Sequence, residues 1–465
     1  FMCASHRVMP TACFPFPQAL PPPFCSSLFP RAPKNGLCVH RSSHPRGKML
    51  ILPPWVPQRC SELVKKGPEQ HGFLKGRSVE TNLCSFLNDV VPIIHNREQA
   101  DVVYFDMMKA FDKVDHRRLL AKLDVYGLFP KYCKLFESYL SKHENLVRVS
   151  SCLSNFSWLR RASHRKSISG LFLIFVNDLT SCVKYSKMLL FADDIKLYRR
   201  TNTVEDCVLH QRDVCSISLW CLTNGLVLNE SKTKIISLSR KRDVLQFCYA
   251  LDTTVISRVS LIRDFGVYLD TEISFNHQVM NIVNSSLNVF GIITRISRNF
   301  RNPQCFLMLF RSLVLSRLEF SSVVWNSIGE SNSSSIERVQ RKFIRVFYDR
   351  YLQSKVFYDY ERICKQIGLR SLCNRRMTRD FMFLHKVVNG VVNCTALLNS
   401  VYLRVPQRSI RIRSLFYPSI LHNADPITRL QLVFNKFESN LDELGIDNFG
   451  CEQTFRKCID VFISF

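Results

Sequence analysis

The sequence is poor in acidic residues: 38 Asp and Glu stand against 64 Lys and Arg, which gives a formal net charge of +26. A chain this basic favours a polyanionic partner, either nucleic acid or an anionic membrane surface. The sequence also lacks an apolar run long enough for a membrane-spanning helix, because charges or prolines interrupt every candidate. A membrane-spanning helix is therefore not expected, and both kinds of polyanionic partner remain open.

Two further absences concern the cellular compartment. The 19 cysteines form no CxxC pair and no regular Cys/His spacing, which argues against a zinc site and a disulfide framework. The apolar stretch CFPFPQALPPPF near the N-terminus is broken by prolines, unlike a secretory signal. Together these features predict an intracellular protein of the nucleus or cytoplasm, with free thiols, that is not secreted.

The chain of 465 residues is long enough for two or more domains. Residues 1–67 are rich in Pro, Cys, Ser and Phe, show no helical or strand periodicity, and contain breaker clusters such as LPPPF and RAPKNG. We predict an irregular N-terminal segment there. The first residue is Phe rather than Met, which indicates a fragment.

Apolar periodicity beyond this segment predicts a succession of helices and strands. Ser78 is the expected cap of one helix, Gly127 ends another, and Asn224–Gly225 stops a third. From about Ile273 onward the pattern is mainly helical and very basic. The stretches expected to be helical are SVETNLCSFLNDVVPII, KVDHRRLLAKLDVYGL, GLFLIFVNDL and VEDCVLHQRDVCSISLWCLTNGL, and those expected to be extended are ADVVYFDMM, LLFADDIKLY and KTKIISLSR.

Acidic residues interrupt two of the most apolar predicted strands. In LLFADDIKLY, Asp193 and Asp194 lie between two short strands around a tight turn, and in VVYFDMMKAFDKVDH, Asp106 ends a strand in the same way. Buried carboxylates are costly unless they are neutralised, and a divalent cation is an effective neutraliser. We predict that these acids gather on one sheet and hold metal. Two Mg²⁺ ions about 3.5–4 Å apart would clamp the attacking and leaving oxygens of a phosphoryl transfer.

Each acid also has an ordinary structural explanation. Aspartate is common in hairpin turns, which would account for Asp193 and Asp194. A cap at the end of a strand would account for Asp106. Asp112 and Asp115 are better explained as residues that start helices than as metal ligands.

Several stretches of the chain, taken in their order, resemble the motifs of one protein family. EQHGFLKGRSVETNL precedes YFDMMKAFDKVDH, which is followed by LFLIFVNDL, FADD, LVLNESKTKIISLSR and LIRDFGVYLDTEISFNHQV. SRLEFSSVVWN, IERVQRKFIRV and LCNRRMTRDFMFLHKVVNG come next. Together these stretches resemble the fingers, palm and following helical region of a reverse transcriptase of the non-LTR (LINE-type) retrotransposon class. The likeness covers roughly residues 68–440.

The resemblance implies an activity and a set of ligands. Asp106, Asp193 and Asp194 match the metal-binding aspartates, and Asp106 and Asp193 would bridge most directly to two Mg²⁺ ions, with Mn²⁺ as an alternative. The implied activity is RNA-directed DNA synthesis, and the implied partners are an RNA template, a DNA primer and deoxynucleoside triphosphates, with no membrane. The alternative is a catalytically inactive, nucleic-acid-binding relic of such an element.

Three more residues receive roles from the same resemblance. Phe111 matches the gate that crowds a 2′-hydroxyl, Lys232 matches a lysine near the pyrophosphate leaving group, and Arg77 matches a fingers residue that meets the incoming triphosphate. The alternatives are a core phenylalanine, a solvated lysine at a strand edge, and an arginine without nucleotide contact.

One segment departs from the family pattern. The family expects a Gly-Pro-Gln-Gly-Ser type of turn before LFLIFVNDL, but residues 160–170 read RRASHRKSISG. This string can be encoded so that a shifted frame spells Ser-Gly-Ile-Pro-Gln and then Glu-Val-His-Leu-Gly-Pro. We hypothesise a compensated frameshift, which the DNA sequence would test, and which leaves Arg165 and Lys166 where compact backbone belongs. With early fingers segments and an endonuclease domain missing, we expect a truncated, degenerate element.

The predicted fold is α+β: a right-hand polymerase with an antiparallel palm sheet backed by helices, truncated fingers, a helical thumb and a helical C-terminal extension. We assign fingers and palm to residues 68–270, the thumb to 271–350 and a basic helical C-terminal region to 351–465. Basic residues and aromatics alternate in and near the thumb, where we expect a grip on a template–primer duplex, with the aromatics mostly in the core. The residues are Arg295, Arg298, Arg301, Arg338, Arg341, Lys342 and Arg345, with Phe300, Phe343 and Phe347.

Overall fold

A sheet of five strands forms the centre of the computed structural model, in the order β11-β8-β2-β7-β6. Strand β2 (Gln99–Phe105), rich in Val and aromatic residues, pairs antiparallel with β7 (Asp194–Arg200) and with β8 (Lys234–Ser239), and β7 pairs antiparallel with β6 (Lys187–Phe191). The predicted antiparallel palm sheet is thus confirmed, with one exception. The short strand β11 (Ser257–Arg258) runs parallel to β8.

The structure describes residues 69–127, 165–352, 357–404, 414–417, 425–441 and 452–462, with short pieces at 38–42, 133–134, 136–138, 143–149, 152–153 and 157–158. Most of the segment 1–67 therefore lies outside the described residues, as do residues 159–164 of the stretch that departs from the family pattern. Strand β1 (Cys38–Ser42) pairs antiparallel with β3 (His143–Val149), and β4 (Cys152–Leu153) and β5 (Ser157–Trp158) also pair with β3.

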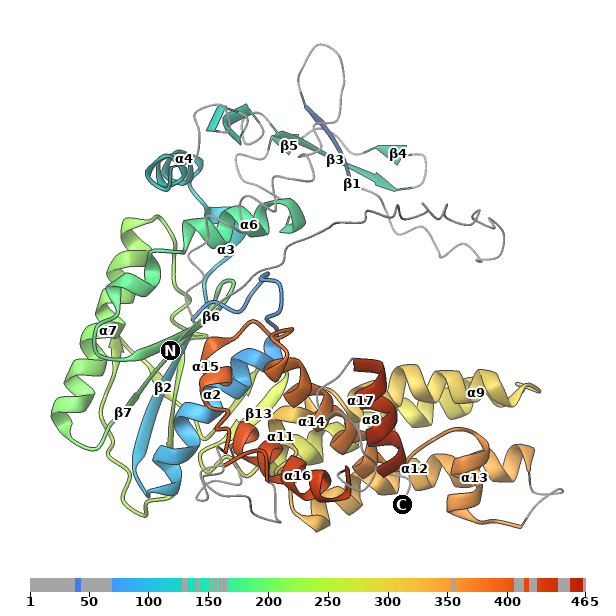
Figure 1. Ribbon diagram of the computed structural model, residues 1–465. Helices are drawn as coiled ribbons and strands as arrows, with labels where there is room; N and C mark the ends of the chain where they lie inside the picture. Colours follow the sequence, from blue (N-terminus) through green and yellow to red (C-terminus); the bar gives the residue numbers. More distant parts are fainter. Residues whose placement is uncertain are drawn as a thin grey trace, which may run out of the picture.

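Helices cover both faces of the sheet (Figure 1). Alternate residues of each strand point to opposite faces, and apolar residues on each face pack against the helices there. On one face, Val103 and Leu197 pack in the core formed with α6 (Arg165–Phe175) and α7 (Val204–Thr223). On the other face, Val102 and Ile236 belong to a core shared with α2 (Val79–His95) and the helical region. The palm and the helical region therefore meet through α2.

The local signals in the sequence begin and end these helices as predicted. The Ser78 side chain accepts a hydrogen bond from the Thr81 amide at the start of α2. Asp115 caps α4 (His116–Val125) by accepting from two backbone amides, which confirms its structural explanation. Asn224 and Gly225, the latter with φ +72°, end α7. Two shorter helices are α3 (Ala110–Lys113) and the 3₁₀-helix η1 (Leu179–Cys182).

Small hairpins connect the sheet to the helical region. They are formed by β9 (Ala250–Leu251) with β10 (Thr254–Val255) and by β12 (Leu261–Asp264) with β13 (Val267–Asp270). The predicted helical pattern after Ile273 is confirmed. The elements are α8 (Asn276–Ile296), α9 (Pro303–Leu309), the π-helix η2 (Phe310–Leu315), α10 (Ser316–Leu318), α11 (Ser322–Trp325), α12 (Glu330–Tyr351), α13 (Tyr360–Gln366), α14 (Leu372–Val388), α15 (Thr395–Asn399), α16 (Pro426–Leu441) and α17 (Glu452–Phe462).

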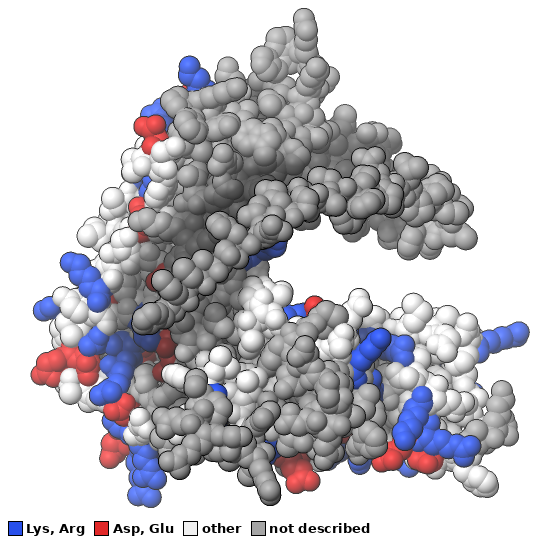
Figure 2. Space-filling view, in the orientation of Figure 1, with Lys and Arg blue, Asp and Glu red and all other residues white. Residues whose placement is uncertain are grey.

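The aromatic and basic residues of this region separate by environment. Phe343 and Phe347 are buried in the shared core, whereas Phe300 is exposed. The basic residues recurring on α8 and α12 and in the segment after α8 are exposed, and Figure 2 shows Lys and Arg side chains over this part of the surface. Within the described part of the chain, none of the helices combines the length and apolarity needed to cross a bilayer.

Candidate active site

The stretch LLFADDIKLY forms the hairpin β6–β7, as predicted. Phe191 ends β6, Asp194 begins β7, and the two residues pair across the strands. Ala192 and Asp193 make the turn between them, and Ala192 has φ +59°, in the left-handed region that non-glycine residues rarely adopt. The turn therefore fixes the direction in which Asp193 and Asp194 leave the sheet.

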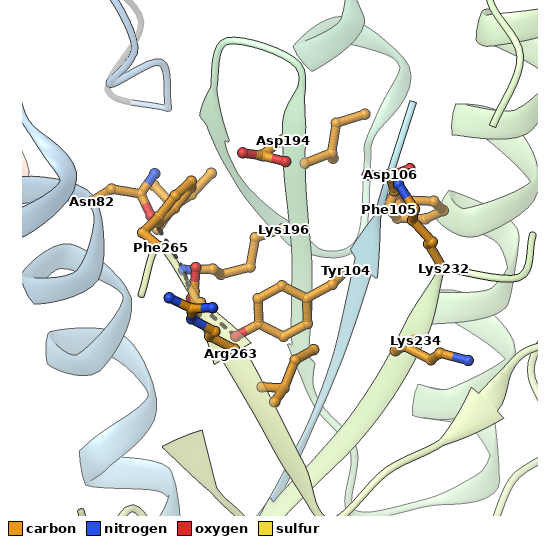
Figure 3. A pocket seen from close by; sticks show the side chains of 14 residues that line it. Asn82, Tyr104, Phe105, Asp106, Asp194, Lys196, Lys232, Lys234, Arg263 and Phe265 are labelled. Atoms are coloured by element: carbon orange, nitrogen blue, oxygen red, sulfur yellow. Dashed lines mark hydrogen bonds and ion pairs between the residues drawn. The ribbon is translucent and has the colours of Figure 1, made fainter. Parts of the chain in front are cut away.

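Asp106 reaches the same edge of the sheet from the neighbouring strand. Phe105 at the end of β2 pairs with Ile195 of β7, so Asp106 follows β2 where β7 begins with Asp194. The carbonyl of Asp106 accepts a hydrogen bond of 2.7 Å from the Asn229 amide. Asp106 and Asp194 both line one cavity of about 290 Å³ (Figure 3). The predicted gathering of strand-end acids on one sheet is thus seen for this pair.

The charge around Asp194 is unusual. Its side chain is reached by solvent at the cavity, yet the surrounding protein removes part of its hydration. This desolvation, followed by the negative charges of Asp193, Asp264 and Asp106, raises the pKa of Asp194 to about 6. The acids are therefore close enough to repel one another, and a cation among them would relieve that repulsion.

Lys232 provides a positive charge on the Asp106 side of the cavity. Its Nζ lies 3.3 Å from Oδ2 of Asp106, and Figure 3 shows the two side chains together. The Lys232 side chain is 66% exposed, so it is free to reach a ligand in the cavity. The same cavity is lined by Lys234 and Arg263. Carboxylates and basic groups thus share one space.

The donor chemistry of this cavity fits a hard divalent cation, because Mg²⁺ and Mn²⁺ prefer carboxylate oxygens. Asp106 and Asp194 line the cavity, whereas Asp193, in the turn before Asp194, does not, although its charge acts on Asp194. Among the residues that the structure describes, no three His, Cys, Asp or Glu side chains converge as a ready ligand set. The predicted metal role of the three aspartates therefore remains a prediction, supported by donor type and charge.

Phe111 and Arg77 contact other parts of the protein. The Phe111 ring lies against Phe172 of α6, with ring centroids 4.5 Å apart, and meets Phe73 edge-on at 6.3 Å. Arg77 donates through Nε to the Asn393 carbonyl at 2.8 Å and through Nη1 to the Gln70 carbonyl. Neither residue lines the cavity of Asp106 and Asp194. Their nucleotide roles stay predictions.

Sequence reasoning missed a buried charged group below the acids. Lys196, two residues after Asp194 on the same face of β7, is 3% exposed and pairs with Asp264 of β12. The Tyr104 hydroxyl donates to Asp264 at 3.1 Å, and Lys196 donates to the Asn82 side chain at 3.2 Å. A lysine inside an apolar strand was the available signal. Asp264 gave none, because its partner is distant in sequence.

Comparisons with known proteins agree with this geometry. Residues 48–249 match the family model described as reverse transcriptase (RNA-dependent DNA polymerase), a range that begins inside the segment predicted to be irregular. The probable RNA-directed DNA polymerase from transposon BS of Drosophila melanogaster is 24% identical over 302 residues, covering 60% of this chain and 32% of that protein. The RNA-directed DNA polymerase from mobile element jockey of Drosophila funebris is 21% identical over 290 residues, covering 59% and 31%. The chain thus spans about a third of the length of these relatives.

A likeness to a solved structure is much weaker. Telomerase from Candida tropicalis shares 12% identity and a TM-score of 0.36, covering 87% of this chain and 55% of that one. This likeness carries no argument about function. Residues 48–249 are similar to reverse transcriptases, and the relatives found by sequence are RNA-directed DNA polymerases of a transposon and of a mobile element.

Proposed function

We propose that this chain is an RNA-directed DNA polymerase that adds deoxynucleotides to a primer 3′-hydroxyl on an RNA template. One observation carries the proposal: Asp106 and Asp194, from two paired strands, line one cavity together with the basic residues Lys232, Lys234 and Arg263. Carboxylates suit a divalent cation, and lysine and arginine suit the phosphates of a nucleotide and a nucleic-acid strand.

The residues would divide the work by position. Asp106, Asp193 and Asp194 would hold two Mg²⁺ ions, which when bound supply charge neutralisation of the triphosphate and activation of the primer hydroxyl. Lys232, at the exposed side of the cavity, would meet the pyrophosphate as it leaves. Most of the rate enhancement in such a site comes from positioning and from charge stabilisation, so the rigidity of the sheet edge matters as much as the acids.

The test is primer extension on a primed RNA with Mg²⁺. We expect Asp193→Asn and Asp106→Asn to lower extension at least about a thousandfold, because each removes a charge from the reacting centre. Asp243→Asn, in the exposed loop after β8, is the matched control and keeps full activity. Comparable extension by Asp193→Asn and the unaltered chain would reject the assignment.

A second candidate is a relic that binds nucleic acid without catalysis. The observation that favours it is a groove of about 380 Å³ between α8 and α12, in which apolar residues lie beside polar and basic ones that include Asn284, Arg338 and Lys342. Contacts of this kind bind a phosphate backbone by releasing counterions, so affinity falls steeply with salt. Salt-dependent binding of an RNA–DNA duplex, without extension by the unaltered chain, would favour this candidate over the polymerase.

A further inference from the structure

A buried glutamine contacts the turn that carries the catalytic acids. Gln70 is 6% exposed, and its Oε1 accepts hydrogen bonds from the Ala192 amide at 3.1 Å and from the Gly72 amide at 2.8 Å. Ala192 is the residue with positive φ that directly precedes Asp193. One side-chain oxygen therefore holds the backbone of the turn at its most constrained position.

The backbone next to Gln70 is joined to strand β6 as well. The Leu190 amide donates to the Glu69 carbonyl, and the His71 amide donates to the Leu190 carbonyl, both at 2.8 Å. Gly72 then passes so close that a Cβ atom there would lie 2.4 Å from the nitrogen of Ala192. Any side chain at this position would push the turn away, so only glycine allows the approach.

Arg77 ties this segment to the C-terminal region. Its Nη1 donates to the Gln70 carbonyl at 2.5 Å, and its Nε donates to the Asn393 carbonyl at 2.8 Å. The Asn393 amide returns a hydrogen bond of 2.9 Å to the Gly76 carbonyl. Gly76 has φ +77°, and a Cβ atom there would lie 2.8 Å from the Val391 carbonyl. The two segments therefore meet backbone to backbone.

The loop that contains Asn393 is itself held on α2. It connects α14 to α15, and the Val392 amide donates to the Lys386 carbonyl at 2.9 Å. Cys394 lies 3.4 Å from the Ser85 hydroxyl, and Asn88 donates to Ser400 at 2.9 Å. Figure 1 shows α15 beside α2. The C-terminal contact is thus part of a packed core.

We propose that residues 69–77 are a turn clamp, through which the C-terminal helical region fixes the position of Asp193 and Asp194. In it, Gln70 and Arg77 are positioning residues: Gln70 holds the turn, and Arg77 holds Gln70 against the loop at Asn393. The catalytic consequence rests on the proposed polymerase function, whereas the clamp itself does not. The clamp also gives Arg77 a role other than contact with a triphosphate.

The clamp is tested by hydrogen exchange at the Ala192 amide, together with primer extension, on the full chain. We expect Gln70→Met, which keeps the length of the side chain and removes the acceptor, to speed exchange at Ala192 about tenfold or more through loss of a buried hydrogen bond. Gln70→Glu keeps an acceptor and keeps the protection. Arg77→Met, which does not touch the turn directly, also speeds exchange at Ala192, by a smaller factor.

Two matched variants control for the loss of similar bonds elsewhere. Gln211→Met removes a side chain that accepts from the Ala250 amide at 2.9 Å. Arg311→Met removes a guanidinium that donates to the carbonyls of Ile367 and Gly368. Both leave exchange at Ala192 and the rate of extension unchanged, with Gln211→Met speeding exchange at Ala250 instead.

The outcomes separate the clamp from the polymerase. Unchanged exchange at Ala192 in Gln70→Met overturns the clamp, and so does an Arg77→Met variant that loosens every segment equally. If exchange at Ala192 rises as expected, extension per folded molecule should fall about a hundredfold, because small displacements of reacting groups are costly. A chain with the expected exchange pattern, but without extension in the unaltered form, keeps the clamp and rejects the proposed function.

Discussion

Asp194 in the palm and Asp380 in helix α14 both have a pKa raised to about 6, and desolvation by the surrounding protein is the largest cause for both. The largest charge effects on the two pKa values differ in sign. Around Asp194 the next causes are the negative charges of Asp193, Asp264 and Asp106, which raise the pKa further. Around Asp380 the guanidinium of Arg429 acts against the rise in pKa.

The hydrogen bonds follow the same division. Asn326 donates to Asp380 at 2.6 Å and Arg429 lies 3.7 Å away, so these groups offset part of the cost of burying the carboxylate. Asp194 faces a cavity in which like charges remain. A raised pKa alone therefore does not mark a functional site. The sign of the largest neighbouring charges separates the two sites: they are acidic at Asp194, where we propose a metal, and basic at Asp380.

The largest effect on stability is expected from the buried pair below the palm acids. Lys196→Met leaves Asp264 buried without its cation, which should lower the free energy of unfolding by about 3–5 kcal/mol. Asp380→Asn in the helical region serves as the comparison, because it also alters a buried charge. At a temperature where both variants are folded, only Lys196→Met should lower primer extension.

A double variant sharpens this expectation. Lys196→Met with Asp264→Leu removes both charges and should recover part of the lost stability in a denaturant titration, since no unpaired charge remains. If the losses of unfolding free energy in the two single variants add up to the loss in the double variant, the pair does not act as a unit.

Local signals in the sequence predict most of the helices and strands of the palm. The cap at Ser78, the stop at Asn224 and the hairpin around Asp193 depend on residues within a few positions of each other, and each was predicted. The meeting of Asp106 with Asp194 needed only that two strand ends lie at one edge of a sheet. Family resemblance predicted that these strands form one antiparallel palm sheet, and the order of the strands within that sheet came from the structure.

Contacts between distant segments could not be predicted in this way. The partner of Arg77 lies 316 positions further along the chain, and nothing near either residue indicates the other. The hydrogen bonds of Gln70 depend on where the loop passes the turn, which side-chain type alone does not determine. The parallel pairing of β11 with β8 was missed because two residues carry no periodicity.

A smaller effect should separate two buried groups, His210 and Asp380, by their response to pH. His210 of α7 is buried, and burial lowers its pKa to about 4. Between pH 6.5 and 4, His210 is therefore protonated in the unfolded chain but neutral in the folded chain. The free energy of unfolding should fall by about 3 kcal/mol as the pH drops through this range. Asp380, with its raised pKa, has the opposite sign: it loses stability as the pH rises from about 4 to 6.

Denaturant titrations across pH 4–7 measure this difference. His210→Gln should make stability fall less steeply on acidification, by one proton, whereas Asp380→Asn should make it fall more steeply. His277→Gln, on the exposed surface of α8, is the control for histidine substitution. Equal slopes of stability against pH in all three variants would contradict the opposite roles of His210 and Asp380.

The smallest effect on stability is expected for two exposed lysines of the palm, which should differ in their effect on catalysis. Lys232 and Lys187 each form an exposed ion pair on the palm, with Asp106 at 3.3 Å and Asp89 at 2.6 Å. Lys232→Met and Lys187→Met should each change the free energy of unfolding by less than about 1 kcal/mol. Extension should fall about tenfold to a hundredfold in Lys232→Met and stay unchanged in Lys187→Met, because Lys232 lines the cavity of the acids and Lys187 does not. If extension responds equally to both substitutions, Lys232 is a solvated lysine like Lys187. Lys234 or Arg263 would then be the basic residue that stabilises the leaving pyrophosphate.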